Sequence, residues 1–213
     1  MRKGSGHLLE HIPFPKISRW NRNITITEKI DGSNGAIGIK QLSVAGLIDE
    51  DNGMPPGTVL VDGTLYQVYA QSRNRIVTIG DNHFGFAQWV EDNKRGLVET
   101  LGEGLHFGEW WGSKIGRGYG CSKGERYFSL FNTSRWNAEN TSSVPGLTTT
   151  PILYEGMMNH YMIEIAASNL RKNGSKAKPG FMMPEGIVIF HTASNHMFKI
   201  TLENDEVPKG LVK

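Results

Sequence analysis

The residues best suited to chemistry form the short run Glu28-Lys29-Ile30-Asp31-Gly32, which follows an alternating apolar stretch. The run places an amine, a carboxylate and an unhindered turn residue together, as an enzyme would need to carry a nucleotide on a lysine. The preceding Ile24-Thr25-Ile26-Thr27 predicts a strand of period two, so Lys29 lies on the opposite face from Glu28. Gly32 permits a sharp turn after this strand. Taken alone, K-x-D-G is also a pattern that arises by chance in a chain with 26 glycines.

Four further segments follow in a fixed order, each on or beside an expected strand. They are Phe107-Gly108-Glu109-Trp110, the aromatic strand Tyr127 to Phe131, Pro184-Glu185-Gly186-Ile187-Val188-Ile189 and Met197-Phe198-Lys199-Ile200-Thr201-Leu202. Together with the lysine run, this series resembles the covalent nucleotidyltransferase superfamily, which contains ATP-dependent DNA and RNA ligases and mRNA-capping guanylyltransferases. The RNA ligase branch is the most similar. The resemblance runs from about Pro15 to Lys209, and each motif is short but their order is specific.

The resemblance implies that Lys29 attacks the α-phosphorus of ATP and forms a lysyl-AMP phosphoramidate. A free lysine amine has a pKa near ~10.4, so attack requires partial desolvation or nearby positive charge. Lys199 resembles the first lysine of the K-x-K motif that holds the α-phosphate, and with a divalent metal it would supply that charge. Thr201 stands where relatives carry the second lysine. This departure would weaken neutralisation of the phosphate.

The resemblance also assigns residues to the nucleotide and the metal. Glu109 would accept hydrogen bonds from the ribose hydroxyls or help with the metal, and Phe131 would stack on the base, which is typically worth ~1–3 kcal/mol. Glu28 and Arg73 complete the expected nucleotide site. Phe131 precedes Asn132 where relatives commonly carry Asp, and Phe131 also fits a core role.

Asp31 and Glu185 are the expected ligands of Mg²⁺ or Mn²⁺, the hard ions that neutralise charge in nucleotidyl transfer. Asp31 fits a turn-forming role equally, and Glu185 fits a plain loop carboxylate. Among the basic residues, Arg75, Lys114 and Arg117 are the predicted nucleic-acid contacts. The basic run from Arg171 to Lys178 is an alternative surface, although solvated loops carry such runs too.

Composition sets broad limits. A chain of 213 residues with 38% hydrophobic residues is enough for one domain with a sizeable core, and we expect a single nucleotidyltransferase domain over residues 1–213 with no appended oligonucleotide-binding barrel. The net charge of +2 does not by itself indicate a nucleic-acid binder. A single cysteine, Cys121, fits a reducing compartment, and no stretch is apolar enough for a membrane span or signal peptide. We therefore expect a cytoplasmic protein without a membrane partner.

Local patterns predict an α+β fold with mainly antiparallel sheets flanked by helices. Val59 to Val61, Asp62-Gly63 and Leu65 to Gln71 predict a tight hairpin. One helix is expected after a cap at Asp81 or Asn82, with Phe86, Val90, Leu97 and Leu101 on its apolar face and Gly102 at its end. A second is expected over about Tyr154 to Arg171, with Met158, Met162 and Ile165 inward. Residues 137–150 are expected to form a surface loop.

The prediction is an ATP-dependent RNA ligase that acts on 5′-phosphate and 3′-OH ends. The same motifs fit a capping guanylyltransferase, and a non-catalytic module that binds RNA ends is the alternative outside the enzymes. Whether end joining needs an accessory protein stays open at this point.

Overall fold

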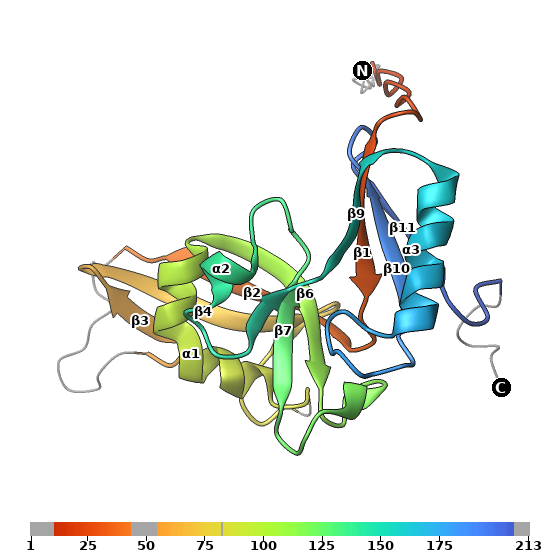
Figure 1. Ribbon diagram of the computed structural model, residues 1–213. Coiled ribbons are helices and arrows are strands. Elements are labelled where there is room, and N and C mark those ends of the chain that lie inside the picture. Colours follow the sequence, from red (N-terminus) through yellow and green to blue (C-terminus); the bar gives the residue numbers. More distant parts are fainter. Residues whose placement is uncertain (1–10, 44–54, 82, 207–213) are drawn as a thin grey trace, which may run out of the picture.

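The computed structural model describes residues 11–43, 55–81 and 83–206, which form two β-sheets with helices against them (Figure 1). The small sheet has the strand order β11-β10-β1-β9, and the large sheet has the order β3-β4-β2-β6-β7-β8, with β5 paired to β4. All strand pairs are antiparallel except β7–β8. The predicted α+β class with mainly antiparallel sheets is confirmed.

The strands of the small sheet are β1 (Asn23–Lys29), β9 (Ile152–Met157), β10 (Gly186–His191) and β11 (His196–Thr201). Those of the large sheet are β2 (Ser33–Gln41), β3 (Thr58–Val61), β4 (Thr64–Ser72), β5 (Ile76–Val77), β6 (Gly104–Gly112), β7 (Arg126–Leu130) and β8 (Leu147–Thr149). The helices are α1 (Phe86–Leu101), α2 (Ala138–Thr141) and α3 (His160–Asn173), with a short 3₁₀ helix, η1, at Gly118–Gly120. No helix in the described ranges is both long and apolar enough to cross a membrane.

Alternation along β1 gives the small sheet one apolar and one polar face. Ile24 and Ile26 are fully buried, and they pack with side chains of α3 and β10, namely Ile163, Ala166, Leu170, Ile187 and Ile189. Burying an aliphatic side chain of this size contributes roughly 1.5–3 kcal/mol. Thr25, Thr27 and Lys29 point to the opposite face, which α3 does not cover. The core on one side therefore dictates the side on which Lys29 emerges.

Helix α1 packs on one face of the large sheet. Phe86, Val90, Leu97 and Leu101 are all buried as predicted, and Gly102 ends the helix with φ 68°. The predicted cap at Asp81 is wrong, because Gly85 is the N-cap residue of the helix and, among the described residues, no side chain caps it. The Asp81 carboxylate instead accepts hydrogen bonds from the N–H and hydroxyl of Thr78. Asn82 lies outside the described residues.

The hairpin prediction is confirmed. Val61 pairs with Thr64, and Asp62 and Gly63 both have positive φ, 47° and 75°. Two positive φ values in succession are the requirement of the two-residue turn that matches strand twist.

Two other predicted boundaries are wrong. Residues 152–157 form strand β9, whose Tyr154 pairs with Ile26 of β1, and α3 starts only after Asn159, whose side chain accepts from the Tyr161 N–H. The expected surface loop at 137–150 contains α2 and β8. It buries Val144 and Leu147 against the large-sheet core.

The two sheets are joined at the turn after β1, where a small third core forms. Ile30, Trp111 and Tyr119 are buried there, with Phe181 of the α3–β10 loop packed against them. A Cβ on Gly32 would lie 2.5 Å from the Trp110 carbonyl oxygen, so only glycine fits where the chain crosses from β1 to β2. The Asp31 N–H donates to the Tyr119 hydroxyl at 2.9 Å. The lysine run is thus held rigidly between the sheets.

Candidate active site

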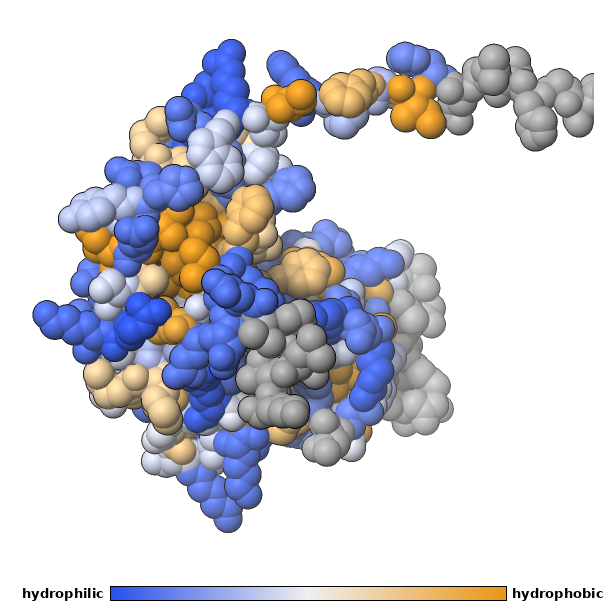
Figure 2. All heavy atoms as spheres, turned by 90° about the vertical axis from the view of Figure 1, so that its right-hand side faces the viewer, coloured by the Kyte–Doolittle hydropathy of each residue, from blue (hydrophilic) through white to orange (hydrophobic). Residues whose placement is uncertain are grey.

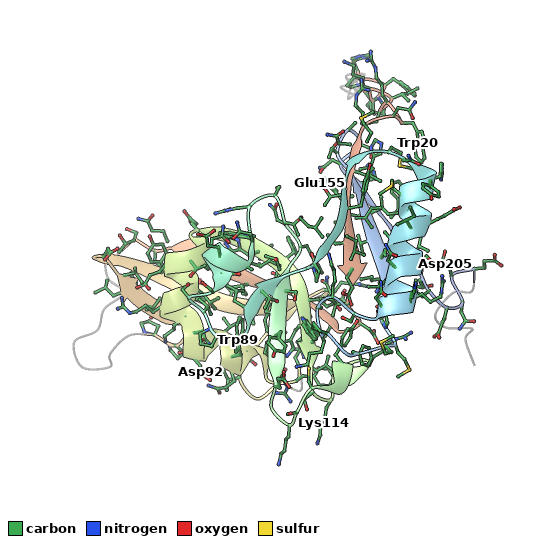
Figure 3. All side chains as sticks on the ribbon, in the orientation of Figure 1. Trp20, Trp89, Asp92, Lys114, Glu155 and Asp205 are labelled. Atoms are coloured by element: carbon green, nitrogen blue, oxygen red, sulfur yellow. The ribbon has the colours of Figure 1, made fainter. Side chains whose placement is uncertain are left out.

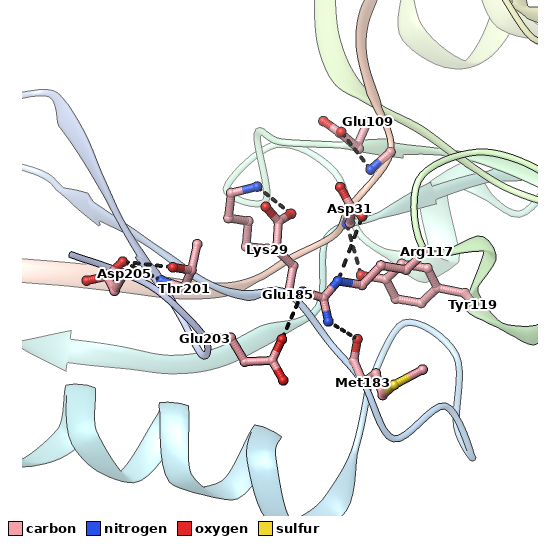
Figure 4. Close-up of polar contacts among 11 residues, drawn as sticks. Lys29, Asp31, Glu109, Arg117, Tyr119, Met183, Glu185, Thr201, Glu203 and Asp205 are labelled. Atoms are coloured by element: carbon pink, nitrogen blue, oxygen red, sulfur yellow. Dashed lines mark hydrogen bonds and ion pairs between the residues drawn. The ribbon is translucent and has the colours of Figure 1, made fainter. Parts of the chain in front are cut away.

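Lys29 is the last residue of β1, and its amine meets a carboxylate from the other end of the chain. Nζ lies 2.5 Å from Oε2 of Glu185, and both side chains are largely buried, at 19% and 4% exposed (Figure 4). Because Lys29 pairs with Gly186 across the β1–β10 ladder, Glu185 is positioned one residue before that pair. Antiparallel strand pairing therefore brings together two of the residues predicted from separate motifs.

Glu109 lies beside this ion pair on the large sheet. Its Oε1 accepts a hydrogen bond from the Gly32 N–H at 3.1 Å, which ties β6 to the turn that follows Lys29. The pKa of Glu109 is raised to about 7, chiefly by burial; Lys29 and the Gly32 N–H oppose the rise, and the like charges of Glu185 and Asp31 add to it. A carboxyl group with a raised pKa indicates that its surroundings do not fully compensate a negative charge at this position.

Replacement of Glu109 by glutamine tests this electrostatic picture in the metal-free chain. The folded-state pKa of about 7 exceeds the ordinary 4.5, so the folded chain binds this proton more tightly than the unfolded chain. The contribution of Glu109 to the free energy of unfolding is therefore full below pH ~4.5 and is lost as pH rises through ~7. In urea unfolding, we expect the free energy of unfolding of E109Q to rise relative to that of the wild type by up to about 3 kcal/mol as the pH increases from ~4.5 to ~8. Parallel pH profiles of the two proteins would contradict it.

Asp31 and Arg117 lie at the edge of the same cluster. The guanidinium of Arg117 has its Nε 3.8 Å from the Asp31 carboxylate and a terminal nitrogen 3.6 Å from Glu203, and it donates to the Met183 carbonyl at 3.0 Å (Figure 4). Arg117 thus links the lysine turn to the segments before and after the last two strands. Its predicted contact with nucleic acid stays a prediction.

Glu28 lies on the face of β1 opposite to Lys29, as the alternation predicts. Its carboxylate is 1% exposed and accepts hydrogen bonds from the N–H groups of Lys176 and Ala177 at 2.7 and 2.9 Å. Burial raises the pKa of Glu28, and the hydrogen bonds from Ser175, Ala177 and Lys176 oppose the rise. The geometry gives this side chain a structural contact with the α3–β10 loop, and it does not place the carboxylate beside Lys29.

Lys199 emerges on the same face of the small sheet as Lys29. Lys199 pairs with Val188, and Val188 pairs with Thr27, which is two residues before Lys29. Paired residues share a face, so both amines point to the same side. Thr201 follows on this face, with its N–H and hydroxyl donating to Asp205 Oδ1 at 2.7 and 3.1 Å (Figure 4). The position of the expected second lysine thus holds a hydroxyl that already has a partner.

The large sheet presents further candidate residues in line with Glu109. Glu109 pairs with Asn34 on one side and Ser129 on the other, so all three side chains share a face. Asn34 was missed in the sequence, although the alternation after Gly32 would have placed it there. Arg73 comes just after β4, one residue beyond the pair Gly35–Ser72, and therefore in line with Asn34.

Phe131 follows β7, and its N–H donates to the Phe107 carbonyl at 3.0 Å. It is partly buried and, two residues after Ser129, lies on the face that carries Glu109.

The remaining basic candidates, Arg75 and Lys114, have exposed side chains. Arg75 pairs with Asp81 at 3.0 Å, although its side chain is 57% exposed. Lys114 is an exposed residue with φ 64° at the turn after β6, and Figure 3 shows its side chain pointing away from the body of the molecule. The structure does not bring these two residues together with Lys29.

The carboxylates around Lys29 fit a divalent cation. Within the described ranges no three His, Cys, Asp or Glu side chains form a cluster that could hold a metal. Mg²⁺, however, is usually bound through one or two carboxylates together with phosphate oxygens of the substrate. Asp31, Glu109 and Glu185 offer the hard oxygen ligands such an ion prefers, and the raised pKa of Glu109 shows that added positive charge would be favourable there.

Apart from the candidate site, the small sheet carries a cavity on its other face. A cavity of about 200 Å³ is lined by apolar and aromatic residues on the α3 side, including Ile163, Ile189, Phe198 and Ile200. Figure 2 looks at this side of the molecule, where hydrophobic residues gather in one patch. The cavity is separated from Lys29 by the sheet itself, so it does not belong to the candidate site.

The sequence matches a model of a known protein family. The RNA ligase family model matches residues 22–201, which contain every candidate site residue named above. No curated protein matches the sequence.

Solved structures of the Naegleria gruberi RNA ligase are similar in fold. A point mutant with ATP and Mn has a TM-score of 0.54 at 14% identity, covering 86% of this chain and 51% of that one. A second mutant with ATP and Mn has a TM-score of 0.52 at 16% identity, with coverages of 86% and 51%. A third, with AMP and Mn, has a TM-score of 0.50 at 17% identity, with coverages of 84% and 49%. The chain spans about half the length of these proteins, and the family match over residues 22–201 shows that it belongs to the RNA ligase family.

Proposed function

We propose that this chain is an ATP-dependent RNA ligase that forms a lysyl-AMP intermediate at Lys29. The observation that carries the proposal is the contact of Lys29 Nζ with Glu185 at 2.5 Å, next to Glu109 and Asp31. A buried amine among three carboxylates, at a glycine turn between two sheets, is suited to attack a phosphorus atom whose charge is neutralised by a cation.

In the first step the Lys29 ammonium leaves Glu185 and gives a proton to solvent, and the neutral amine attacks the α-phosphorus of ATP. A bond forms between Nζ and phosphorus, and the bond from that phosphorus to the bridging oxygen of pyrophosphate breaks. Lys199, on the same face, stabilises the negative charge that develops on the α-phosphate oxygens. Asp31 and Glu185 would hold Mg²⁺ or Mn²⁺, which when bound adds positive charge at the phosphates.

In the second step an oxygen of a 5′-phosphate end attacks the same phosphorus, the Nζ–phosphorus bond breaks, and the leaving Lys29 nitrogen takes up a proton from solvent. In the third step a 3′-OH attacks the 5′-phosphorus of the activated end, which joins the strands and releases AMP. Two of the solved relatives contain ATP and Mn, and a third contains AMP and Mn, which supports these cofactors.

The nucleoside would occupy the space between the two sheets. In this proposal Phe131 stacks on the base, while Glu109 and Arg73, which strand register places in the same row across the large sheet, contact the ribose and phosphates. The single cysteine, Cys121, is compatible with a reducing compartment, and we place the reaction in the cytoplasm, in RNA repair.

Labelling with α-³²P nucleotides tests the proposal. We expect the wild-type chain with Mg²⁺ or Mn²⁺ to take a label from ATP that survives denaturation and is released by acid, because a phosphoramidate is acid-labile. Label from GTP alone would assign the chain to capping chemistry. The absence of label from either nucleotide, together with tight RNA binding, would favour a non-catalytic module.

A further inference from the structure

The open face of the large sheet, opposite α1, carries exposed aromatic and aliphatic side chains beside the candidate site. The two faces are distinguished by the glycines. A Cβ on Gly35 would lie 2.9 Å from Phe86 of α1, whereas a Cβ on Gly38 would lie 2.1 Å from the ring of Tyr69. Gly35 therefore faces the helix, and Tyr69 covers Gly38 on the open face. Phe107, in register with Ala36, shares this open face with Tyr69.

Strand register arranges this face in successive rows that start at the candidate site. The first row is polar and holds Ser129, Glu109 and Asn34. The second holds Phe107, Ala36 and Gln71, with Phe131 hydrogen-bonded beside Phe107, and the third holds Leu105, Gly38 and Tyr69. Neighbouring strands are about 4.8 Å apart, and alternate residues along a strand are about 6.8 Å apart. The second and third rows therefore lie about one and two such repeats along the strands from the polar row, a separation comparable to one or two nucleotides of an RNA strand.

Exposure and charge indicate what this face binds. Phe107 is 50% exposed and Leu105 is 42% exposed, although both are in the middle of a paired strand. Cations flank these rows, because the exposed Lys40 lies on the same face beyond Leu105 and the exposed Arg73 lies in line with the first row. Aromatic faces between cationic side chains are the arrangement by which sheet surfaces bind single-stranded nucleic acid.

We propose that Phe107 and Tyr69 stack on bases of the single-stranded RNA whose end lies at Lys29, with Lys40 at its phosphates. The inference rests on the proposed function and adds to it the path of the RNA strand. Phe131 would stack on the nucleotide that reacts, and Phe107 is the first residue of the path beyond it.

The test uses Phe107→Ala with a short 5′-phosphorylated single-stranded RNA as the probe. Loss of one stacked base should raise the Kd for this RNA by about 5- to 150-fold in fluorescence anisotropy at fixed salt, since base stacking on an aromatic side chain is worth ~1–3 kcal/mol. The rate of lysyl-AMP formation from ATP should stay within about twofold of the wild type. Phe198→Ala is the matched control, because Phe198 is similarly exposed, at 51%, but lies on the α3 side of the small sheet, away from the open face of the large sheet.

The outcomes separate this inference from the proposed function. Wild-type affinity for RNA in Phe107→Ala would overturn the path across the open face, while labelling by ATP would still support the ligase proposal. Loss of ATP labelling in Phe107→Ala would also overturn it, since Phe107 would then belong to the nucleotide pocket. An equal loss of RNA affinity in Phe198→Ala would contradict a specific role for the open face. If the wild-type chain takes no label, the ligase proposal itself fails.

Discussion

Replacement of Lys29 by alanine is expected to abolish covalent labelling by α-³²P-ATP, with a loss of at least about a thousandfold, because removing an enzyme's nucleophile leaves only the background reaction. The Lys29 amine forms the ion pair with Glu185, and alanine is compatible with the extended backbone of β1. The measurement is the amount of denaturation-resistant label formed at saturating ATP.

Lys172→Ala is the matched control for this experiment. Lys172 is an exposed residue in the last turn of α3, so its loss should change neither labelling nor folding. Circular dichroism of Lys29→Ala should match that of the wild type. Undiminished labelling of a folded Lys29→Ala variant would remove Lys29 from its proposed role.

Replacement of Lys199 by alanine is expected to slow lysyl-AMP formation by about 10²- to 10³-fold, the usual effect of removing one group that stabilises charge in a transition state. The register of β11 with β10 and β1 places this ammonium on the same face as Lys29. The measurement is the single-turnover rate of labelling at saturating ATP, which separates the chemical step from ATP binding.

Two companion variants sharpen this prediction. Lys199→Arg retains the charge and should recover part of the rate. Thr201→Ala should label within a few-fold of the wild type, because the Thr201 hydroxyl is engaged by Asp205 and carries no charge. A Lys199→Ala variant that labels at the wild-type rate would show that the charge on the α-phosphate is neutralised elsewhere.

The elements that could be predicted from the sequence are those in which a local pattern and the fold agree. The alternation around Ile24 and Ile26 predicts both the strand and the side on which Lys29 emerges, since one face must be buried. The Asp62-Gly63 hairpin needs no distant contact. In both cases neighbouring residues carry the whole signal.

Other features depend on partners that are distant in the chain. The helix predicted from about Tyr154 runs across Gly156 and Asn159, whereas in the structure residues 152–157 pair with β1 as a strand and Asn159 caps α3. The loop expected at 137–150 folds into α2 and β8 because Val144 and Leu147 find an apolar surface on the large sheet. Such tertiary contacts override local propensity.

The candidate site divides in the same way. Lys29, Glu109 and Glu185 could be named from motifs, but the 2.5 Å contact between the first and last needs strands 156 residues apart to pair. Asn34 lacked a motif to mark it and was found only through its register with Glu109. The contact of Glu28 with the α3–β10 loop also arises only in the folded chain.

Peptide mass spectrometry of the wild-type chain after incubation with ATP and a divalent cation tests the central claim most directly. We predict one AMP group per chain, attached through phosphorus to the side-chain nitrogen of Lys29 and discharged when 5′-phosphorylated RNA is added. An AMP group on any other residue, or an unmodified Lys29 in a folded and ATP-bound chain, would contradict it.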